Sequence, residues 1–238
     1  AINRAIKYAL NQTPINYDLM IKMLNKLDVR LLSDKPFVNN EGREFESFKE
    51  RYFRLKVRAL FETKQYKACV ECANQALATP LKWHYNALQW IKYYRGCALL
   101  ELKEYDEAEK IYDKLINNDS KNAQYYILKG ECLAKSGDAK AAVKVYEQGW
   151  NSTNDTDFLE KICEIYVEQK DYDNALKYIQ KGIEQGGESK AGFMYGKIVI
   201  YEKAQEYDRA YEAAKKYVEL YPDDEAGKKE YIFLSTRI

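Results

Sequence analysis

Cys69 and Cys72 have the only spacing in this chain that is typical of a metal or redox site. A structural zinc site needs two further ligands close by, and the remaining cysteines, Cys97, Cys132 and Cys163, are spread far along the chain. A thioredoxin-like redox site needs a strand–helix–strand setting, which the surrounding pattern does not indicate. We therefore interpret Cys69 and Cys72 as core residues on one helix, and we predict neither a metal nor a cofactor.

His84 is the single histidine of the chain. Histidine is the side chain that most readily exchanges a proton near neutral pH, and it is also the commonest metal ligand. Trp83 and Tyr85 flank it, and no serine, cysteine or carboxylate stands beside it in a catalytic pattern. We interpret His84 as a residue of the surface or of a junction between repeats.

The carboxylates that could serve as acid and base recur at regular intervals, as in Asp106, Asp173 and Asp208. A residue that recurs in successive units is better explained by a turn than by a single active site. The adjacent glycines Gly186 and Gly187 lack the strand–loop–helix context of a phosphate-binding loop. The sequence thus predicts no catalytic residue and a protein that is not an enzyme.

The composition indicates a folded, helix-rich chain. Of 238 residues, 46% are hydrophobic and 32% are charged, with only 4 prolines, which excludes collagen-like and disordered classes. No stretch approaches the roughly 20 apolar residues of a membrane span, and no secretory signal is visible. The odd number of dispersed cysteines suits reduced thiols, so we expect a cytoplasmic protein without a membrane partner. The chain begins at Ala1 without an initiator methionine, which is compatible with a piece of a longer protein.

Charge is unevenly distributed along the chain. Residues 1–103 carry 18 Lys and Arg against 10 Asp and Glu, whereas residues 104–238 carry 20 against 27. The net charge of +1 therefore conceals a basic first part and an acidic second part. Partners of opposite charge will be attracted to different parts of the protein.

A short motif recurs five times. Four copies contain a tyrosine within a charged turn, and the fifth has an alanine there. The spacings between successive copies are 39, 34, 33 and 35 residues. Apolar residues three and four apart precede and follow each copy, so the unit is a helix, a tight turn and a second helix. The aligned residues are Tyr66, Tyr105, Ala139, Tyr172 and Tyr207.

These units resemble the tetratricopeptide repeat family, whose first helix carries an aromatic, Leu-Gly and a second aromatic, and whose second helix carries Ala, an aromatic and Ala. The first unit departs most, because Cys69 replaces the small alanine and Val57 stands at the glycine position. The matching residues are Gly96, Leu99, Ala108, Tyr112 and Leu115, then Tyr126, Gly130, Leu133, Ala142 and Tyr146, then Leu159, Tyr166, Ala175 and Ile179, and finally Tyr201, Ala210 and Pro222.

The resemblance implies an all-α fold, a right-handed α-solenoid of about five repeats with capping helices. We expect a helical cap and loop over residues 1–49, the repeat array over 50–224 and a capping helix over 225–238. The units of the array are expected near 50–83, 89–122, 123–155, 156–189 and 191–224. Within these regions we expect helices at Ile2–Leu10, Ile15–Leu32 and Leu81–Leu102, and a loop over residues 33–42.

In the proteins that this chain resembles, the first helices line a concave groove through the second, fifth, ninth, twelfth and thirteenth positions of each unit. Transferred to this chain, these positions predict a groove that changes from basic through aromatic to acidic. Three arginines on one helix repel each other without an anion, and an internal carboxylate, Glu46 or Glu50, is the alternative to a ligand. The predicted groove residues are Arg51, Arg54, Arg58, Trp90, Tyr93, Gln124, Ile127, Glu131, Asp157, Glu160, Glu164 and Tyr195, together with Glu101 and Glu168.

The leading interpretation is a non-enzymatic scaffold that binds a peptide or a partner domain, including another domain of a parent protein. The alternative is a helical repeat that binds a short single-stranded nucleic acid, because basic and aromatic residues are interspersed between Lys82 and Tyr94. We rank nucleic acid below a protein partner, since the acidic second part would repel a long strand. Self-association through opposite charges is a third possibility.

Overall fold

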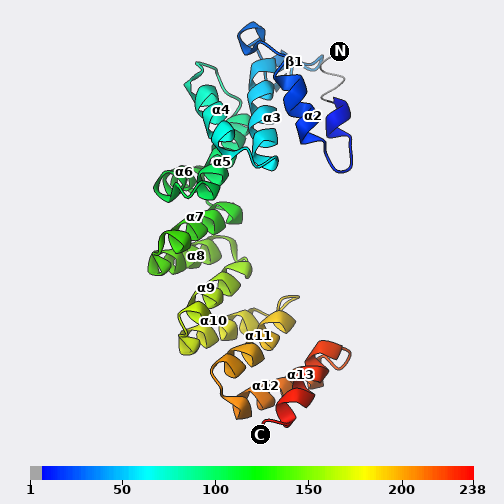
Figure 1. Ribbon diagram of the computed structural model, residues 1–238, viewed down its shortest axis with the longest axis vertical. Coiled ribbons are helices and arrows are strands. Elements are labelled where there is room, and N and C mark those ends of the chain that lie inside the picture. The colour runs from blue at the N-terminus through cyan, green and yellow to red at the C-terminus, as the bar shows by residue number, and fades with distance from the viewer. Residues whose placement is uncertain (1–6) are drawn as a thin grey trace. The chain divides into compact units, whose positions relative to one another are not determined.

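The computed structural model describes residues 7–238, and its regular structure is almost entirely helical (Figure 1). The chain divides into two compact units, the first ending at Ser120 and the second running from Lys121 to Ile238. The elements of the first unit are α2 (Tyr17–Leu24), the short helix η1 (Val29–Leu31), β1 (Phe37–Val38), β2 (Glu44–Phe45), α3 (Phe48–Glu62), α4 (Tyr66–Ala78), α5 (Tyr85–Glu101) and α6 (Tyr105–Asn118). Those of the second are α7 (Ala123–Ser136), α8 (Ala139–Thr153), α9 (Asp157–Glu168), α10 (Tyr172–Gln185), α11 (Lys190–Lys203), α12 (Tyr207–Leu220) and α13 (Glu225–Ser235).

The turn between the two helices of each repeat has one geometry throughout. Its left-handed residue lies two positions before the second helix, and the next residue donates its amide to the carbonyl five residues earlier, as Glu104 does to Leu99 over 2.9 Å. This bond satisfies a carbonyl that the end of the first helix would otherwise leave unpaired. The left-handed residues are Lys64, Lys103, Gly137, Lys170 and Gln205.

Acidic residues at these turns act in two ways. Asp138 and Asp171 cap the second helix by accepting hydrogen bonds from the amides of Ala141 and Asn174. The aspartates that directly follow a tyrosine lie instead within the first turn of the second helix. There their negative charge interacts favourably with the positive end of the helix dipole. The aspartates of the Tyr-Asp pairs are therefore not the residues that cap these helices.

Small residues bring the two helices of a unit together. Tyr112 of α6 packs against Gly96 of α5, and Tyr146 of α8 packs against Gly130 of α7. The small residues at the crossing are fully buried, as their recurrence predicts. They are Cys69, Ala108, Ala142, Ala175 and Ala210.

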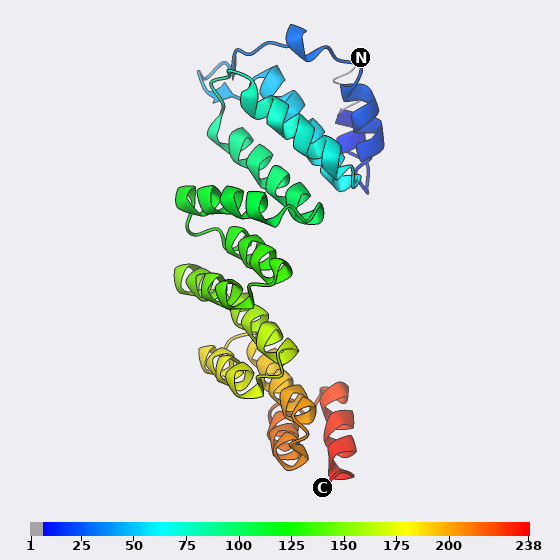
Figure 2. The same ribbon diagram turned by 60° about the vertical axis from the view of Figure 1, so that its left-hand side comes forward.

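Helix α13 closes the second unit by packing along α12 (Figure 2). Gly227 of α13 lies against the ring of Tyr217, whose hydroxyl donates a hydrogen bond of 2.6 Å to Asp224. Asp224 also caps α13 by accepting from the amide of Ala226. The helix expected at 225–238 thus forms over Glu225–Ser235.

The helices of the first unit differ from the expectation at two points. Helix α5 begins at Tyr85, so the helix expected from Leu81 was wrong. Residues 80–84 form a connecting loop, which the buried Glu50 fixes by accepting a hydrogen bond from the backbone amide of His84. The helix expected over Ile15–Leu32 ends at Leu24, where the chain turns towards η1. The helix expected at Ile2–Leu10 begins among residues 1–6, which lie outside the described residues.

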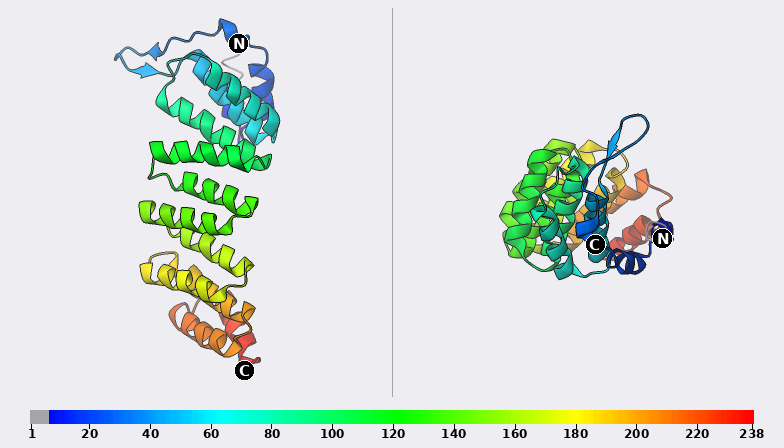
Figure 3. Two further views of the ribbon diagram at one scale, coloured as in Figure 1. Left: turned by 90° about the vertical axis from the view of Figure 1, so that its left-hand side faces the viewer. Right: turned by 90° about the horizontal axis from the view of Figure 1, so that it is seen from above.

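The loop expected over residues 33–42 contains one strand of a β-hairpin, which projects from the helices of the first unit (Figure 3). Asn39 forms the turn by accepting hydrogen bonds from the amides of Glu41 and Arg43, over 3.1 and 2.9 Å. Gly42 completes it at a φ of 77°, a value that favours glycine. This turn sets Phe37 of β1 opposite Phe45 of β2.

Candidate functional site

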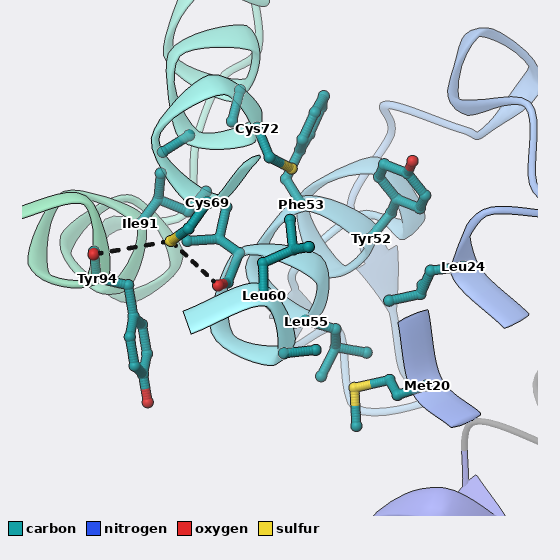
Figure 4. Close-up of a cluster of buried hydrophobic side chains, with 14 of the residues drawn as sticks. Met20, Leu24, Tyr52, Phe53, Leu55, Leu60, Cys69, Cys72, Ile91 and Tyr94 are labelled. Atoms are coloured by element: carbon teal, nitrogen blue, oxygen red, sulfur yellow. Dashed lines mark hydrogen bonds between the residues drawn. The ribbon is translucent and has the colours of Figure 1, made fainter. Parts of the chain in front are cut away.

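The Cys69–Cys72 pair lies in the core of the first unit (Figure 4). The Cys69 thiol donates to the backbone oxygens of Val57 and Tyr94, over 3.4 and 3.8 Å. Burial raises the pKa of Cys69 to about 12 and that of Cys72 to about 11, so both stay protonated at neutral pH. Among residues 7–238, no group of three or more His, Cys, Asp and Glu side chains could hold a metal ion. The pair fills space in the core.

The three arginines predicted for the groove follow one another along α3 but have different surroundings. Glu46 accepts two hydrogen bonds from Arg54, of 2.7 and 2.5 Å, so the internal carboxylate considered above is the partner of Arg54. Arg58 lies 3.6 Å from Glu62 and over the ring of Tyr17 of α2.

Arg51 is less engaged. It reaches Glu46 only at 3.6 Å, and its side chain is 58% exposed. Of the three arginines, Arg51 is therefore the most available to an external carboxylate.

Trp90 is the most prominent aromatic residue on α5. It is 46% exposed, although its ring stacks on Tyr94 at 5.5 Å and meets Tyr93 edge-on at 6.0 Å. Neighbouring rings thus hold a large side chain in place without burying it. Rigid, partly exposed aromatics of this kind are common anchors in protein interfaces.

Predicted groove residues of the second unit form an acidic face. Asp157, Glu160 and Glu164 follow one another on α9, and burial, Asp157 and Glu164 together raise the pKa of Glu160. Burial, followed by the charges of Glu131 of α7 and Glu164, raises the pKa of the Tyr146 hydroxyl. Glu164 also pairs with Lys161 over 3.1 Å. Gln124 is exposed and Ile127 half-buried on α7.

Tyr195 of α11 lies at the end of this unit, where its ring meets Tyr217 at 5.6 Å. Two nearby carboxylates were missed by the sequence reasoning. Glu202 and Glu230 share a hydrogen bond, and burial, followed by this bond, raises the pKa of Glu202 to about 7. Glu202 is the twelfth residue of the unit expected at 191–224, which is one of the five groove positions, so the transfer of those positions could have found it. Glu230 lies on α13, outside the repeats, and this transfer could not have found it.

The hairpin supplies a second feature that sequence reasoning missed. Phe37, Phe45 and Phe48 are 57%, 39% and 49% exposed, and with Glu46 and Arg51 they line a cavity of about 310 Å³. Turn-forming Asn39 and Gly42 between the apolar residues Phe37 and Phe45 were the available signal. The basic and acidic sets of predicted groove residues belong to different units, and one continuous groove stays a prediction.

Residues 49–236 match a family model described as tetratricopeptide repeat. The chain belongs to the tetratricopeptide repeat (TPR) family. It is 25% identical over 163 residues to a TPR repeat-containing protein of Methanocaldococcus jannaschii. This match includes 68% of the present TPR chain but only 28% of the archaeal protein.

Solved structures share the fold. The MamA fragment of Desulfovibrio magneticus has a TM-score of 0.59 at 14% identity, with 77% of this chain and 92% of that one covered. The C-terminal part of a TPR protein of Cytophaga hutchinsonii has a TM-score of 0.58 at 23% identity, over 76% and 69%. YrrB, titled a TPR protein with an unusual peptide-binding site, has a TM-score of 0.50 at 18% identity, over 76% and 92%. The predicted all-α solenoid is thereby confirmed. Within residues 7–238, no helix could cross a bilayer.

Proposed function

We propose that this TPR protein is a non-enzymatic scaffold that binds a peptide or a partner domain through the faces of its first helices. The exposure of Trp90 carries this proposal. A tryptophan that is 46% exposed while packed against Tyr93 and Tyr94 is not needed to fill the core. It offers a partner a large contact area at little cost in side-chain entropy.

An exposed arginine of the same unit favours a partner segment that carries a carboxylate. Arg51 is largely exposed, and it approaches Glu46, which is hydrogen-bonded to Arg54, only at 3.6 Å. A planar guanidinium can take a carboxylate through two parallel hydrogen bonds. The first unit would therefore bind an acidic segment with an aromatic or aliphatic side chain against Trp90.

The second unit favours the opposite charge. On α9, Glu160 is destabilised as an anion by burial and by Asp157 and Glu164. A Lys or Arg side chain of a partner would relieve this repulsion. The acidic face of the second unit would accordingly bind a basic segment.

The structural relative YrrB is described by its title as binding a peptide, which supports a peptide as ligand. The cytoplasm stays the compartment that we propose, because all five cysteines are buried free thiols and such thiols suit a reducing environment.

The test is a selection from a random peptide library with the purified chain as bait, followed by affinity measurements on selected peptides. Trp90→Ala should weaken binding at least about tenfold, which is the range of an interface anchor. Tyr85→Ala removes a similarly exposed aromatic, 54% exposed, from the start of the same helix and should change the affinity less than about twofold. Circular dichroism should show that both variants stay folded.

Equal loss in both variants, or no selected peptide, would contradict the assignment of Trp90. Single-stranded oligonucleotides provide the other arm. Oligonucleotide binding that falls steeply with salt, and that Arg51→Glu abolishes, would favour the nucleic-acid alternative over the scaffold.

A further inference from the structure

A cation recurs at one place in the first helices of the repeats, ten residues before the aligned turn residue, in every unit but the fourth, which has Ile162. In the first two units it has a defined partner. Lys56 donates to the Tyr52 hydroxyl over 2.9 Å and lies over the same ring. Arg95 pairs with Glu107 over 3.2 Å. The recurring cations are Lys56, Arg95, Lys129 and Lys197.

Lys197 differs from Lys56 and Arg95. Among residues 7–238 its one hydrogen bond is to the Gln180 side chain, at 3.4 Å, and no carboxylate lies within 4 Å of it. Burial lowers the pKa of Lys197, and Lys216 and Arg209 lower it further. A cation that is half-buried beside two other cations is an unfavourable arrangement unless an anion joins it.

The residue at the matching place on the second helix explains the difference. Glu107, the partner of Arg95, stands two residues after Tyr105; two residues after Tyr207 the chain has Arg209. The ion pair of one repeat is thus replaced in the last repeat by two like charges. Arg209 turns instead to Glu206 over 2.6 Å and lies over the Tyr201 ring.

Lys197 borders a cavity of about 410 Å³ between α10 and α12. Ile183, Met194 and Ala213 give this cavity apolar walls, and Arg209 and Lys216 also line it. An adjoining cavity of about 600 Å³ is bordered by Lys197 as well. None of the residues around either cavity belongs to the predicted groove.

We propose that this cavity is a second docking site, which takes an acidic segment of a partner protein. An aliphatic or aromatic side chain of that segment fills the apolar cavity, and a neighbouring Asp or Glu replaces the missing partner of Lys197 and Lys216. The site adds a second surface to the proposed scaffold and does not need the groove to be occupied.

The surrounding charges favour a single carboxylate over a polyanion. Asp208 and Glu212 also line the cavity, and Asp173 and Glu184 line the adjoining one. Arg209 lines both cavities as well, and Lys177 and Lys181 line the adjoining one, so cations and acids alternate around them. Such a mixed surface suits one carboxylate beside an apolar side chain better than the successive phosphates of a nucleic acid.

The test uses fluorescein-labelled peptides of about ten residues that contain one Leu or Phe next to one Glu in a Gly-Ser background. Matched peptides carry Lys in place of Glu, or Ser in place of Leu or Phe. In fluorescence anisotropy the acidic apolar peptides should bind the full chain, and the matched peptides should bind at least about tenfold more weakly.

Two substitutions test whether the peptide binds at this cavity. Lys197→Met keeps the length of the side chain and removes its charge, so binding should fall at least tenfold without loss of thermal stability. Arg209→Glu restores the arrangement of Arg95 and Glu107 and should block the peptide carboxylate in the same way. Lys215→Met, the same change at an exposed position of α12 outside both cavities, should leave binding unchanged.

Wild-type affinity in Lys197→Met or Arg209→Glu, or equal binding of the Lys-containing peptides, would overturn the proposal. So would a preference for oligonucleotides, or a concentration-dependent mass in sedimentation that Lys197→Met abolishes, because these results would assign the cavity to nucleic acid or to a second copy. Trp90→Ala should leave this binding intact, which separates the docking site from the groove.

Discussion

Gly130 and Tyr146 show how closely a single pair of residues sets the contact between two helices. A Cβ atom at Gly130 would overlap the Tyr146 ring, whereas a Cβ at Gly96 would lie 3.0 Å from the Tyr112 ring. The same sequence position therefore tolerates different changes in neighbouring repeats. Ring placement, rather than the glycine alone, decides how much room remains.

Gly130→Ala should lower the free energy of unfolding by about 1–3 kcal/mol, because the added methyl group overpacks the helix crossing. Gly96→Ala is the matched comparison and should be nearly neutral, since a gain in helix propensity of about 1 kcal/mol offsets its milder crowding. Urea unfolding followed by circular dichroism measures both. Equal effects in the two variants would contradict the overlap at Gly130.

Lys103→Gly should raise the free energy of unfolding by about 0.5–1 kcal/mol. Lys103 has a φ of 64°, and a side chain in the left-handed region costs roughly 1–2 kcal/mol. Lys103 is exposed, so the substitution removes little packing. Lys110→Gly, the same change inside α6, should destabilise by about 1 kcal/mol. Both variants are measured by urea unfolding. If Lys103→Gly does not raise the free energy of unfolding, the backbone at Lys103 is not strained.

At the scale of the elements, each helix is held by its neighbours more than by its own sequence. The last helix of the second unit illustrates this. Helix α13 contacts α12 through Gly227 and Tyr217, and α11 through the hydrogen bond between Glu202 and Glu230. Two carboxyl groups can share a hydrogen bond only while one of them keeps its proton. The attachment of α13 is therefore sensitive to pH.

The pKa of Glu202 in the folded protein is about 7, above its ordinary value of 4.5. A raised pKa means that the proton contributes stability at low pH and that this contribution is lost as pH rises through 7. Amide hydrogen exchange in α13 should therefore be more strongly accelerated between pH 6 and pH 8 than the intrinsic rate predicts. Burial, followed by Glu230, Glu202 and Asp224, also raises the pKa of the Tyr195 hydroxyl.

Glu202→Gln, which mimics the protonated carboxyl, should remove this additional acceleration. Glu219→Gln on the exposed side of α12 should preserve it. An unchanged response in Glu202→Gln would show that the pair does not control the attachment of α13.

At the scale of the whole molecule, stability comes from apolar side chains buried along the repeats, with thiols among them. Cys69 and Cys72 are buried in the first unit and Cys163 in the second. Burial raises the pKa of Cys163 to about 12, above its ordinary value of 9.0. Because the unfolded chain releases these protons first, alkaline conditions favour unfolding of both units.

The free energy of unfolding should fall between pH 8 and pH 10. Each of the thiols of Cys69, Cys72 and Cys163 contributes about 1.4 kcal/mol to this loss, because one pKa unit corresponds to about 1.4 kcal/mol. Cys163→Ala should reduce the loss by that amount in urea titrations at the two pH values. Native thiols should also react slowly with a disulfide reagent at pH 8. Rapid reaction, or an unchanged loss in Cys163→Ala, would contradict the burial.

The sequence by itself determined the repeat, the helix pairs and the small residues at the crossings. These features are encoded locally, since a helical period, a turn and a buried small residue, such as Ala108 or Cys69, recur in every unit whatever surrounds them. The hairpin and the loop before Tyr85 were predicted wrongly because a turn around Asn39 and a distant contact from Glu50 override the local pattern.

Only the tertiary structure decided which side chains are free to bind. Arg51 and Arg54 are alike in the sequence, but Glu46 accepts both hydrogen bonds from Arg54 and leaves Arg51 exposed. Lys197 is separated in sequence from Lys216 and from the walls of its cavity, and packing of α10, α11 and α12 brings them together. Charge and burial depend on distances between side chains, and in this fold those distances arise when the helices pack.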